Sequence, residues 1–320
     1  MERIDHTKRD LYIRIAKMYY LQELSQQEIS TEVHLSRSQI SKILTACRKL
    51  NVVEIKVHDT SSIGLKLQDE LKMMFSLKHV IVTPSVDDEE QSKIHVAAQA
   101  ADLFSSLIEN SMRIGLTRGS TLYHIVNQLD VLSRVHIEVV QMVGGTGFFD
   151  ILTDGHELTR TLADKLGGES RVLQAPLFVK NTKLKKMLTA EPGIVELLRE
   201  AETVDLALMG LGTNHVKSSA FCRFGFMTEE ESIEMLAQGA VGDICGQQID
   251  IEGNLFDADL NKRVIAVNLE QVKNIPHKVV AAAGVDKAEV ILGALRGGFI
   301  DYLVIDEDAA INVIELIKQP

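Results

Sequence analysis

Apolar residues recur at helical spacing near the start of the chain. Leu11, Ile15 and Met18 stand at positions i, i+4 and i+7. Because residues three or four apart lie on the same face of an α-helix, this pattern predicts an amphipathic helix over residues 5–20.

Two sequences typical of helix starts follow this helix. In residues 25–28 and again in residues 36–39, a Ser precedes a Glu or Gln by three positions. Such a pair satisfies backbone N–H groups that have no partner within the helix. The first of the two helices must end near Val33, because the second begins after Ser36. A turn of about three residues around His34 then separates them, and this spacing predicts a helix-turn-helix.

The second of these helices has one apolar face and one polar face. Ile40, Ile43, Leu44 and Cys47 share the apolar face, and the outward residues are short or basic. Such side chains suit a helix that enters the major groove of DNA and reaches base edges and phosphates. The alternative is a three-helix bundle whose polar face is only solvated. We predict DNA contacts from Ser36, Arg37, Ser38, Gln39, Ser41 and Lys42.

Residues 52–75 predict two further elements. The segment Val52–His58 alternates apolar and polar residues, which indicates a strand that would serve as a wing. Farther on, Ile63, Leu67, Leu71 and Met74 form one stripe on a predicted helix. This stripe either pairs two subunits or packs on the protein's own larger domain, and the pattern favours neither.

From residue 76 onward, short β-rich runs alternate with helix-compatible segments. Alternation of this kind predicts a mainly parallel sheet covered by helices on both faces, with ligands at the carboxyl ends of the strands. The expected strands are His79–Thr83, Arg113–Leu116, His136–Met142, Arg171–Gln174, Val204–Met209, Val264–Val267, Lys278–Ala283 and Tyr302–Ile305.

A phosphate site is predicted after the strand Arg113–Leu116. Arg118, Gly119, Ser120 and Thr121 form a short loop that leads into a helix. Free N–H groups, the positive end of the helix dipole and two hydroxyl groups meet at such a point and suit a phosphate. Neither GxxxxGK[ST] nor GxGxxG is present, so an ordinary tight turn between strand and helix is the alternative.

Other glycine-rich segments predict further approaches of the backbone to a ligand. They are expected to be turns that follow strands, and they include Gly144 and Gly145, residues 210–213 with Gly212, and residues 239–243. Asp243 is a candidate acceptor of sugar hydroxyls, although capping of a helix would also explain it. Lys287 opens a predicted helix, where a cation opposes the dipole, and contact with an anion would explain its position.

Composition narrows the class of protein. Three separated cysteines with no CxxC pair argue against a disulfide scaffold and a zinc site, and no apolar run reaches the length of a membrane span. We therefore expect a cytoplasmic protein without a metal or cofactor. The net charge of −11 is unevenly divided: residues 1–58 carry +3 and residues 59–320 carry −14. A basic head on an acidic body is expected when only the head meets a polyanion.

With these features together, the whole chain resembles the SorC family of sugar-responsive bacterial transcriptional regulators. The resemblance lies in LSQQEISTEVHLSRSQISKIL near the start and in IGLTRGSTL, VVQMVGGTG, LALMGLGT, GAVGDICG and AAAGVDKAEVILGALRGGFIDYLVID farther on. It implies a body with the fold of sugar-phosphate isomerases and phosphate held at Gly119, Ser120 and Thr121. It also implies sugar contacts from Gly144, Gly145, Asp243 and Lys287, and homotetramers that bind paired operator sites.

Two functions from different classes follow. The first is a regulator of a carbohydrate-utilisation operon, controlled by a phosphorylated sugar or polyol. It would have a helix-turn-helix domain over residues 1–58, a linker helix and possible oligomerisation seam over 59–75, and an effector-binding domain over 76–320. The second is a sugar-phosphate isomerase-like enzyme with an accessory DNA-binding head. The sequence carries no clear general-base pair, which favours the first.

Overall fold

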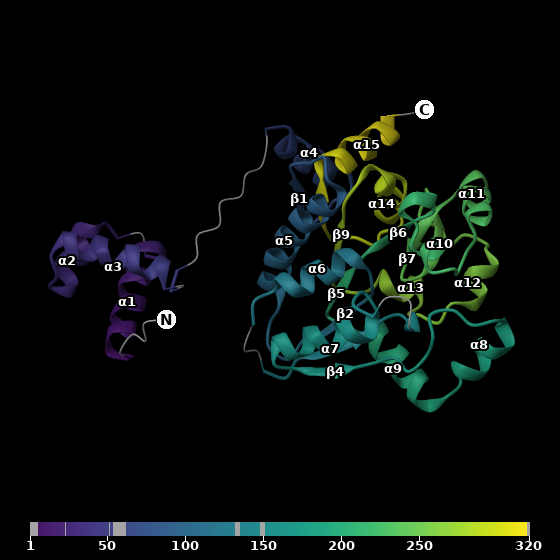
Figure 1. Cartoon of the computed structure of the whole chain (residues 1–320), viewed down its shortest axis with the longest axis horizontal. Helices are drawn as coiled ribbons and strands as arrows, with labels where there is room; N and C mark the ends of the chain where they lie inside the picture. The colour runs from purple at the N-terminus through teal and green to yellow at the C-terminus, as the bar shows by residue number, and fades with distance from the viewer. Residues whose placement is uncertain are drawn as a thin grey trace. The chain divides into compact units, whose positions relative to one another are not determined.

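The computed structural model describes residues 6–22, 24–50, 52–53, 62–131, 135–147 and 151–318. The chain divides into two compact units, Met1–Asp59 and Thr60–Pro320 (Figure 1). In the part that the structure describes, no helix has the length and apolar character that crossing a bilayer requires.

Three helices lie in the described residues of the first unit: α1 (His6–Tyr20), α2 (Gln26–Val33) and α3 (Arg37–Lys49). Each of them contributes buried apolar side chains to a common core, which contains Ile15, Met18, Ile29, Ile40 and Leu44. The helices thus stabilise one another by packing their apolar faces together.

Both predicted capping boxes are present. The side chains of Ser25 and Ser36 accept hydrogen bonds from the N–H groups of Glu28 and Gln39, at 3.3 and 3.2 Å. His34 ends α2 in the left-handed conformation, with φ at 55°. The predicted helix-turn-helix is therefore confirmed. Most of the strand predicted over residues 52–58 lies outside the described residues.

Seven parallel strands form the main sheet of the second unit, in the order β1-β10-β9-β5-β2-β3-β4. They are β1 (His79–Thr83), β2 (Arg113–Leu116), β3 (Glu138–Gln141), β4 (Glu169–Arg171), β5 (Leu206–Met209), β9 (His277–Ala282) and β10 (Tyr302–Asp306). The predicted parallel sheet is confirmed, although the strand predicted over Arg171–Gln174 shares only Arg171 with β4.

Helices cover both faces of this sheet (Figure 1). The helices described in the second unit are α4 (Ser62–Met74), α5 (Glu89–Leu107), α6 (Ser120–Gln128), α7 (Gly155–Leu166), α8 (Thr182–Leu188), α9 (Pro192–Glu202), α10 (Ala220–Arg223), α11 (Glu229–Ala237), α12 (Asp259–Arg263), α13 (Leu269–Val272), α14 (Ala288–Arg296) and α15 (Glu307–Lys318), with the short 3₁₀ turns η2 (Val216–Ser218) and η3 (Val285–Lys287).

Alternate residues of the central strands enter two separate cores. Along β9, Val279 and Ala281 pack into a core shared with α5, α6 and α7. Val280 and Ala282 point to the other face, into a larger core shared with α4, α9, α14 and α15. Since a strand directs successive side chains to opposite faces, burial on both sides accounts for its continuous apolar sequence.

Two sequence expectations are corrected. Residues 210–213 and 239–243, which looked like glycine-rich turns, contribute strands β6 (Leu211–Thr213) and β7 (Ala240–Ile244) to an antiparallel sheet with β8 (Gln247–Asp250). The strand predicted over Val264–Val267 is wrong. That segment is extended but forms only isolated bridges, from Val264 to Phe178 and from Ala266 to Val143.

Helix α4 packs on the second unit. Leu67 and Leu71 are buried in the larger core, whereas Ile63 and Met74 are exposed. Leu67 and Leu71 of the predicted stripe therefore pack within the chain. Pairing of subunits through the exposed Ile63 and Met74 stays a prediction.

Candidate functional site

A cavity of about 280 Å³ opens at the carboxyl ends of the central strands. Val143 follows β3, Thr117 and Arg118 follow β2, Gly210 follows β5 and Ala283 follows β9, and all of them line it. This is the edge of a parallel sheet at which ligands bind, because the loops that follow the strands meet there.

The first turn of α6 forms one wall of this cavity. Gly119 precedes the helix with φ at 131°, a conformation that favours glycine, and it provides no side-chain cap. The N–H groups at the start of an α-helix have no acceptors within the helix. Ser120 and Thr121 line the cavity. The wall therefore presents hydroxyl groups and the positive end of the helix dipole, which together suit an anion.

Cations outnumber carboxylates in the cavity lining. The cationic residues are Lys93, Arg118, Lys217, Arg223 and Lys287, and the acidic residues are Glu89 and Asp243. The ring of Phe224 lies 4.9 Å from the Arg118 guanidinium carbon and 5.0 Å from that of Arg223, so it holds both groups on one aromatic side chain. The local charge is therefore positive, although the body as a whole is acidic.

Asp243 and Lys287 both line the cavity, and their opposite charges interact. Loss of water on burial raises the pKa of Asp243 to about 6, against the opposing effects of Lys287 and Arg118. Burial likewise lowers the pKa of Lys287 to about 8, with Asp243 acting in the opposite direction. The Lys287 ammonium donates a hydrogen bond of 2.7 Å to the carbonyl of Leu211, which anchors it on β6.

The position of Asp243 depends on a glycine in the neighbouring strand. Gly212 pairs with Asp243 between β6 and β7, and a Cβ at Gly212 would overlap the Asp243 carboxylate. The same carboxylate accepts a hydrogen bond of 3.2 Å from the N–H of Gly246. The small antiparallel sheet thus presents this acidic side chain to the cavity.

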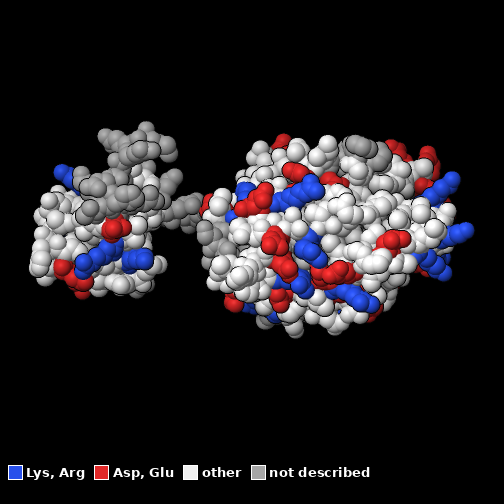
Figure 2. Space-filling view, turned by 90° about the horizontal axis from the view of Figure 1, so that it is seen from below, with Lys and Arg blue, Asp and Glu red and all other residues white. Residues whose placement is uncertain are grey.

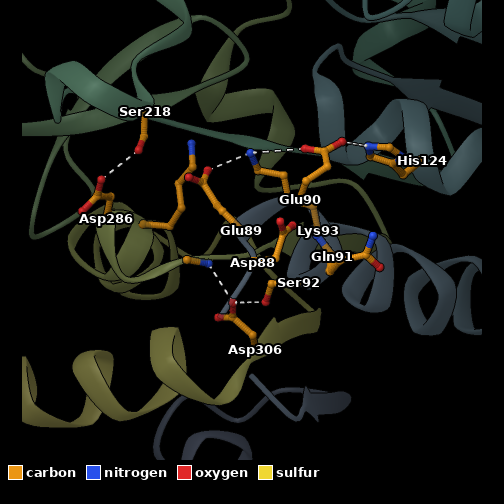
Figure 3. A network of polar contacts seen from close by, with 12 residues as sticks. Asp88, Glu89, Glu90, Gln91, Ser92, Lys93, His124, Ser218, Asp286 and Asp306 are labelled. Carbon is orange, nitrogen blue, oxygen red and sulfur yellow. Dashed lines mark hydrogen bonds and ion pairs between the residues drawn. The ribbon is translucent and has the colours of Figure 1, made fainter. Parts of the chain in front are cut away.

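A network of polar contacts at the start of α5 borders the cavity (Figure 3). Lys93 lies 2.7 Å from the carboxylate of Glu89, and the carboxylate of Glu90 accepts a 2.7 Å hydrogen bond from Nε2 of His124 on α6. Nearby, the buried Asp306 accepts a 2.7 Å hydrogen bond from the Ser92 hydroxyl. These contacts tie α5 to α6 and to the end of β10, and so fix Lys93 beside the first turn of α6.

The structure brings together most of the residues predicted to bind an effector. Those that line the cavity are Arg118, Gly119, Ser120, Thr121, Gly212, Asp243 and Lys287. Gly144 and Gly145 do not line it. Their N–H groups donate to the carbonyls of Ile265 and Ala175, each at 2.9 Å, so the backbone of both glycines pairs with neighbouring segments.

Sequence reasoning missed several lining residues. Lys93 and Glu89 lie on α5, and Lys217, Ser218 and Arg223 lie in the segment after β6. Lys217 and Arg223 lie far from Gly119 in the sequence, and no local pattern connects them with the loop before α6. Among the described residues, no group of three His, Cys, Asp or Glu side chains could hold a metal ion.

The residues predicted to contact DNA all lie exposed at the start of α3. Ser36 and Gln39 also cap the helix, because the amide oxygen of Gln39 accepts a hydrogen bond of 2.8 Å from the N–H of Ser36. Arg37, Ser38, Ser41 and Lys42 present their side chains to solvent.

Comparison with known proteins supports this picture. The model of the family named "Putative sugar-binding domain" matches residues 62–315. The deoxyribonucleoside regulator of Bacillus subtilis (strain 168) is 27% identical over 96% of this chain and 98% of its own length.

Solved structures agree with these matches. The crystal structure of the full-length sorbitol operon regulator SorC from Klebsiella pneumoniae has a TM-score of 0.76 and 26% identity, and it covers 97% of this chain and 99% of its own. A DeoR family transcriptional regulator from Listeria monocytogenes, 27% identical, has a TM-score of 0.71 over 78% of this chain and 99% of its own. The match of the family model and the full-length likeness to SorC place the chain in the SorC family of sugar-binding transcriptional regulators.

Proposed function

We propose that this regulator binds operator DNA through α3 and that a phosphorylated sugar or polyol, bound in the cavity of the second unit, changes its affinity for the operator. The observation that carries the ligand class is the excess of cations around the first turn of α6. A phosphate there would accept from the N–H groups of that turn and from Arg118.

The remaining lining suits the hydroxyl groups of a carbon chain. Between pH 6 and 8, Asp243 is mainly a carboxylate and Lys287 mainly an ammonium group. Asp243 would then offer a hydrogen-bond acceptor, and Lys287 a donor, in the cavity that the first turn of α6 also lines. The names of the relatives, a sorbitol operon regulator and a deoxyribonucleoside regulator, are consistent with a sugar or polyol as the effector.

Binding is favoured over turnover. The cavity lining in the described part of the chain contains no histidine, and the Lys287 ammonium is held on a backbone carbonyl. The relatives named as regulators support this choice over a sugar-phosphate isomerase.

The assembly belongs to the same proposal. One small helix-turn-helix makes few base contacts, so specificity requires two or more copies on adjacent half-sites. We propose a cytoplasmic homo-oligomer, with the tetramer that the family resemblance implies.

Thermal unfolding with candidate ligands tests the effector site. A correct sugar phosphate at about 100 times its dissociation constant should stabilise the native state by about 2.7 kcal/mol, and the unphosphorylated sugar by far less. Thr121→Glu should abolish the shift, because it places a carboxylate at the start of α6, while DNA binding persists. Equal shifts from sugar and sugar phosphate, or an undiminished shift in Thr121→Glu, would place the phosphate elsewhere.

A further inference from the structure

Helix α8 is an unusual element of the second unit because none of its residues is buried. It has seven residues and begins at Asn181, whose side chain accepts a 2.9 Å hydrogen bond from the N–H of Leu184. Short helices are marginal in water and are normally held by packing of an apolar face. The exposed fractions of Leu184 and Met187 are 39% and 59%. Leu188, at the end of α8, packs against the larger core, whereas Leu184 and Met187 have no such cover.

The same helix is strongly basic. Lys183, Lys185 and Lys186 belong to it and Lys180 precedes it, within a body that is acidic overall. Lys183, Lys186 and Met187 lie on its outward face, whereas Lys185 is half-buried and burial lowers its pKa. Basic side chains are visible at the right-hand end of the view in Figure 2, the end at which Figure 1 places α8.

A groove with apolar and acidic lining residues lies beside α8, whose own side chains are apolar and basic. It measures about 290 Å³ and runs between α11 and α12. Its floor is apolar and consists of Phe226, Met227, Met235, Phe256 and Leu260, and its rim carries the carboxylates of Glu231, Glu234, Asp257 and Asp259 together with Arg263. Asp259 pairs with Arg263 at 2.6 Å and Asp257 with Lys262 at 2.9 Å, so Glu231 and Glu234 give the rim its net negative charge. An apolar floor with an acidic rim complements a helix that presents apolar and basic side chains.

The groove cannot be filled by the α8 of its own chain, since Leu184 and Met187 are exposed in the folded unit. Helix α8 contacts α12, which forms one wall of the groove, so projection and groove are neighbours on one side of the unit. When two complementary surfaces lie side by side on one chain, a two-fold axis between two copies brings each projection into the partner's groove.

We infer that α8 of one copy docks in the α11–α12 groove of a second copy, in a reciprocal two-fold contact. DNA is the other partner that basic side chains suit. The exposed Leu184 and Met187 favour a protein groove, because contacts with phosphates are made by polar and charged side chains. The inference rests on the proposed homo-oligomer, but not on the identity of the effector or the operator.

Charge exchange between the two surfaces tests this contact in the full-length chain. Lys183→Glu/Lys186→Glu makes α8 acidic, and Glu234→Lys/Asp257→Lys makes the groove rim basic. Each variant alone then sets like charges against each other at both contacts of the pair. Sedimentation velocity should show a smaller assembly for each variant, with a dissociation constant raised on the order of tenfold or more.

Mixing the two variants should restore the assembly. In the mixed pair, one contact joins the native α8 to the native groove, and the other joins the acidic α8 to the basic groove. The control Lys17→Glu/Arg160→Glu, which changes exposed charges by the same amount on α1 and α7, should keep the wild-type mass. Circular dichroism verifies that each variant is folded.

Three results would overturn the inference: a monomeric wild type at about 100 µM, unchanged mass in both variants, or a mixture no larger than either variant alone. Weaker DNA binding by Lys183→Glu/Lys186→Glu at unchanged mass would assign α8 to DNA instead. The ligand-induced thermal shift, measured on the same variants, reports separately on the proposed effector site.

Discussion

Gly212 and Asp243 form the tightest side-chain constraint at the site, because a Cβ on Gly212 would overlap the Asp243 carboxylate. Gly212→Ala should displace that carboxylate and weaken effector binding on the order of tenfold. Overpacking of this kind should also lower the free energy of unfolding by about 1–3 kcal/mol. Calorimetric titration and chemical denaturation measure the two effects.

Gly193→Ala is the matched control, since a Cβ at that exposed position in α9 meets nothing within 4 Å. It should leave ligand affinity unchanged. Equal affinity of Gly212→Ala and wild type would show that Asp243 does not contact the effector.

The proposed contact of Lys287 with the effector should make effector binding depend on pH. Burial lowers the pKa of its amine to about 8, so the ammonium form predominates below pH 8 and the neutral amine above it. A bound phosphate favours the ammonium and raises this pKa. Binding at pH 8 should therefore take up a fraction of a proton, and affinity should fall as the pH rises above 8. Titration calorimetry in buffers of different ionisation enthalpy measures the uptake.

Lys287→Met should lose the proton uptake, and Lys262→Met, on the exposed surface of α12, should retain it. Absence of uptake in the wild type would exclude Lys287 from contact with the anion.

At the level of secondary-structure elements, local signals predicted local structure well. The capping boxes located α2 and α3 because a cap depends on residues within one turn. Most strands of the main sheet were found because burial on both faces leaves a continuous apolar run. Strand β4 was placed too late in the sequence, since its three residues are exposed or half-buried and give no such run. The antiparallel sheet was missed, since β6 is three residues long and glycines interrupt both β6 and β7. Val264–Val267 has the composition of a strand, but its backbone bonds to two different segments, near Leu177 and near Val143, and forms only isolated bridges with each.

The site was only partly predictable, because sequence patterns report on neighbouring residues and not on residues that the tertiary fold brings together. Arg118 to Thr121 follow one strand directly, so the rule for strand ends located them. Lys93, Lys217 and Arg223 reach the cavity from distant elements, and only the tertiary fold brings them together. Gly144 and Gly145 follow β3 as expected, but pairing with Ala175 and Ile265 uses their backbone groups.

The proposed DNA contacts of α3 can be tested at Arg37. Arg37→Ala should weaken operator binding by about 1–3 kcal/mol if its guanidinium reads a base, and should weaken binding to all sequences evenly if it contacts phosphate. Gel-shift titrations on operator and random DNA distinguish the two. Lys17→Ala, which removes an exposed cation from α1, is the control. Unchanged affinity of Arg37→Ala for both DNAs would remove α3 from the interface.

At the scale of the whole molecule, the charge is divided in the same way as the two proposed functions, DNA binding and effector binding. Residues 1–58 carry +3 and residues 59–320 carry −14. A polyanion is attracted to the first region and repelled by the second, so the acidic body limits unspecific contact between DNA and the effector-binding unit.

The cationic cavity within that acidic body has a kinetic consequence. An incoming phosphate crosses a repulsive field before it reaches Arg118 and the start of α6, and salt screens that field over about 10 Å at 0.1 M. Rising ionic strength should therefore speed effector association in stopped-flow measurements, while it weakens DNA binding through counterion competition. Effector association that slows with salt would contradict this. Under the proposed function, salt would then act on effector binding and DNA binding in opposite directions, before any conformational coupling between the two sites.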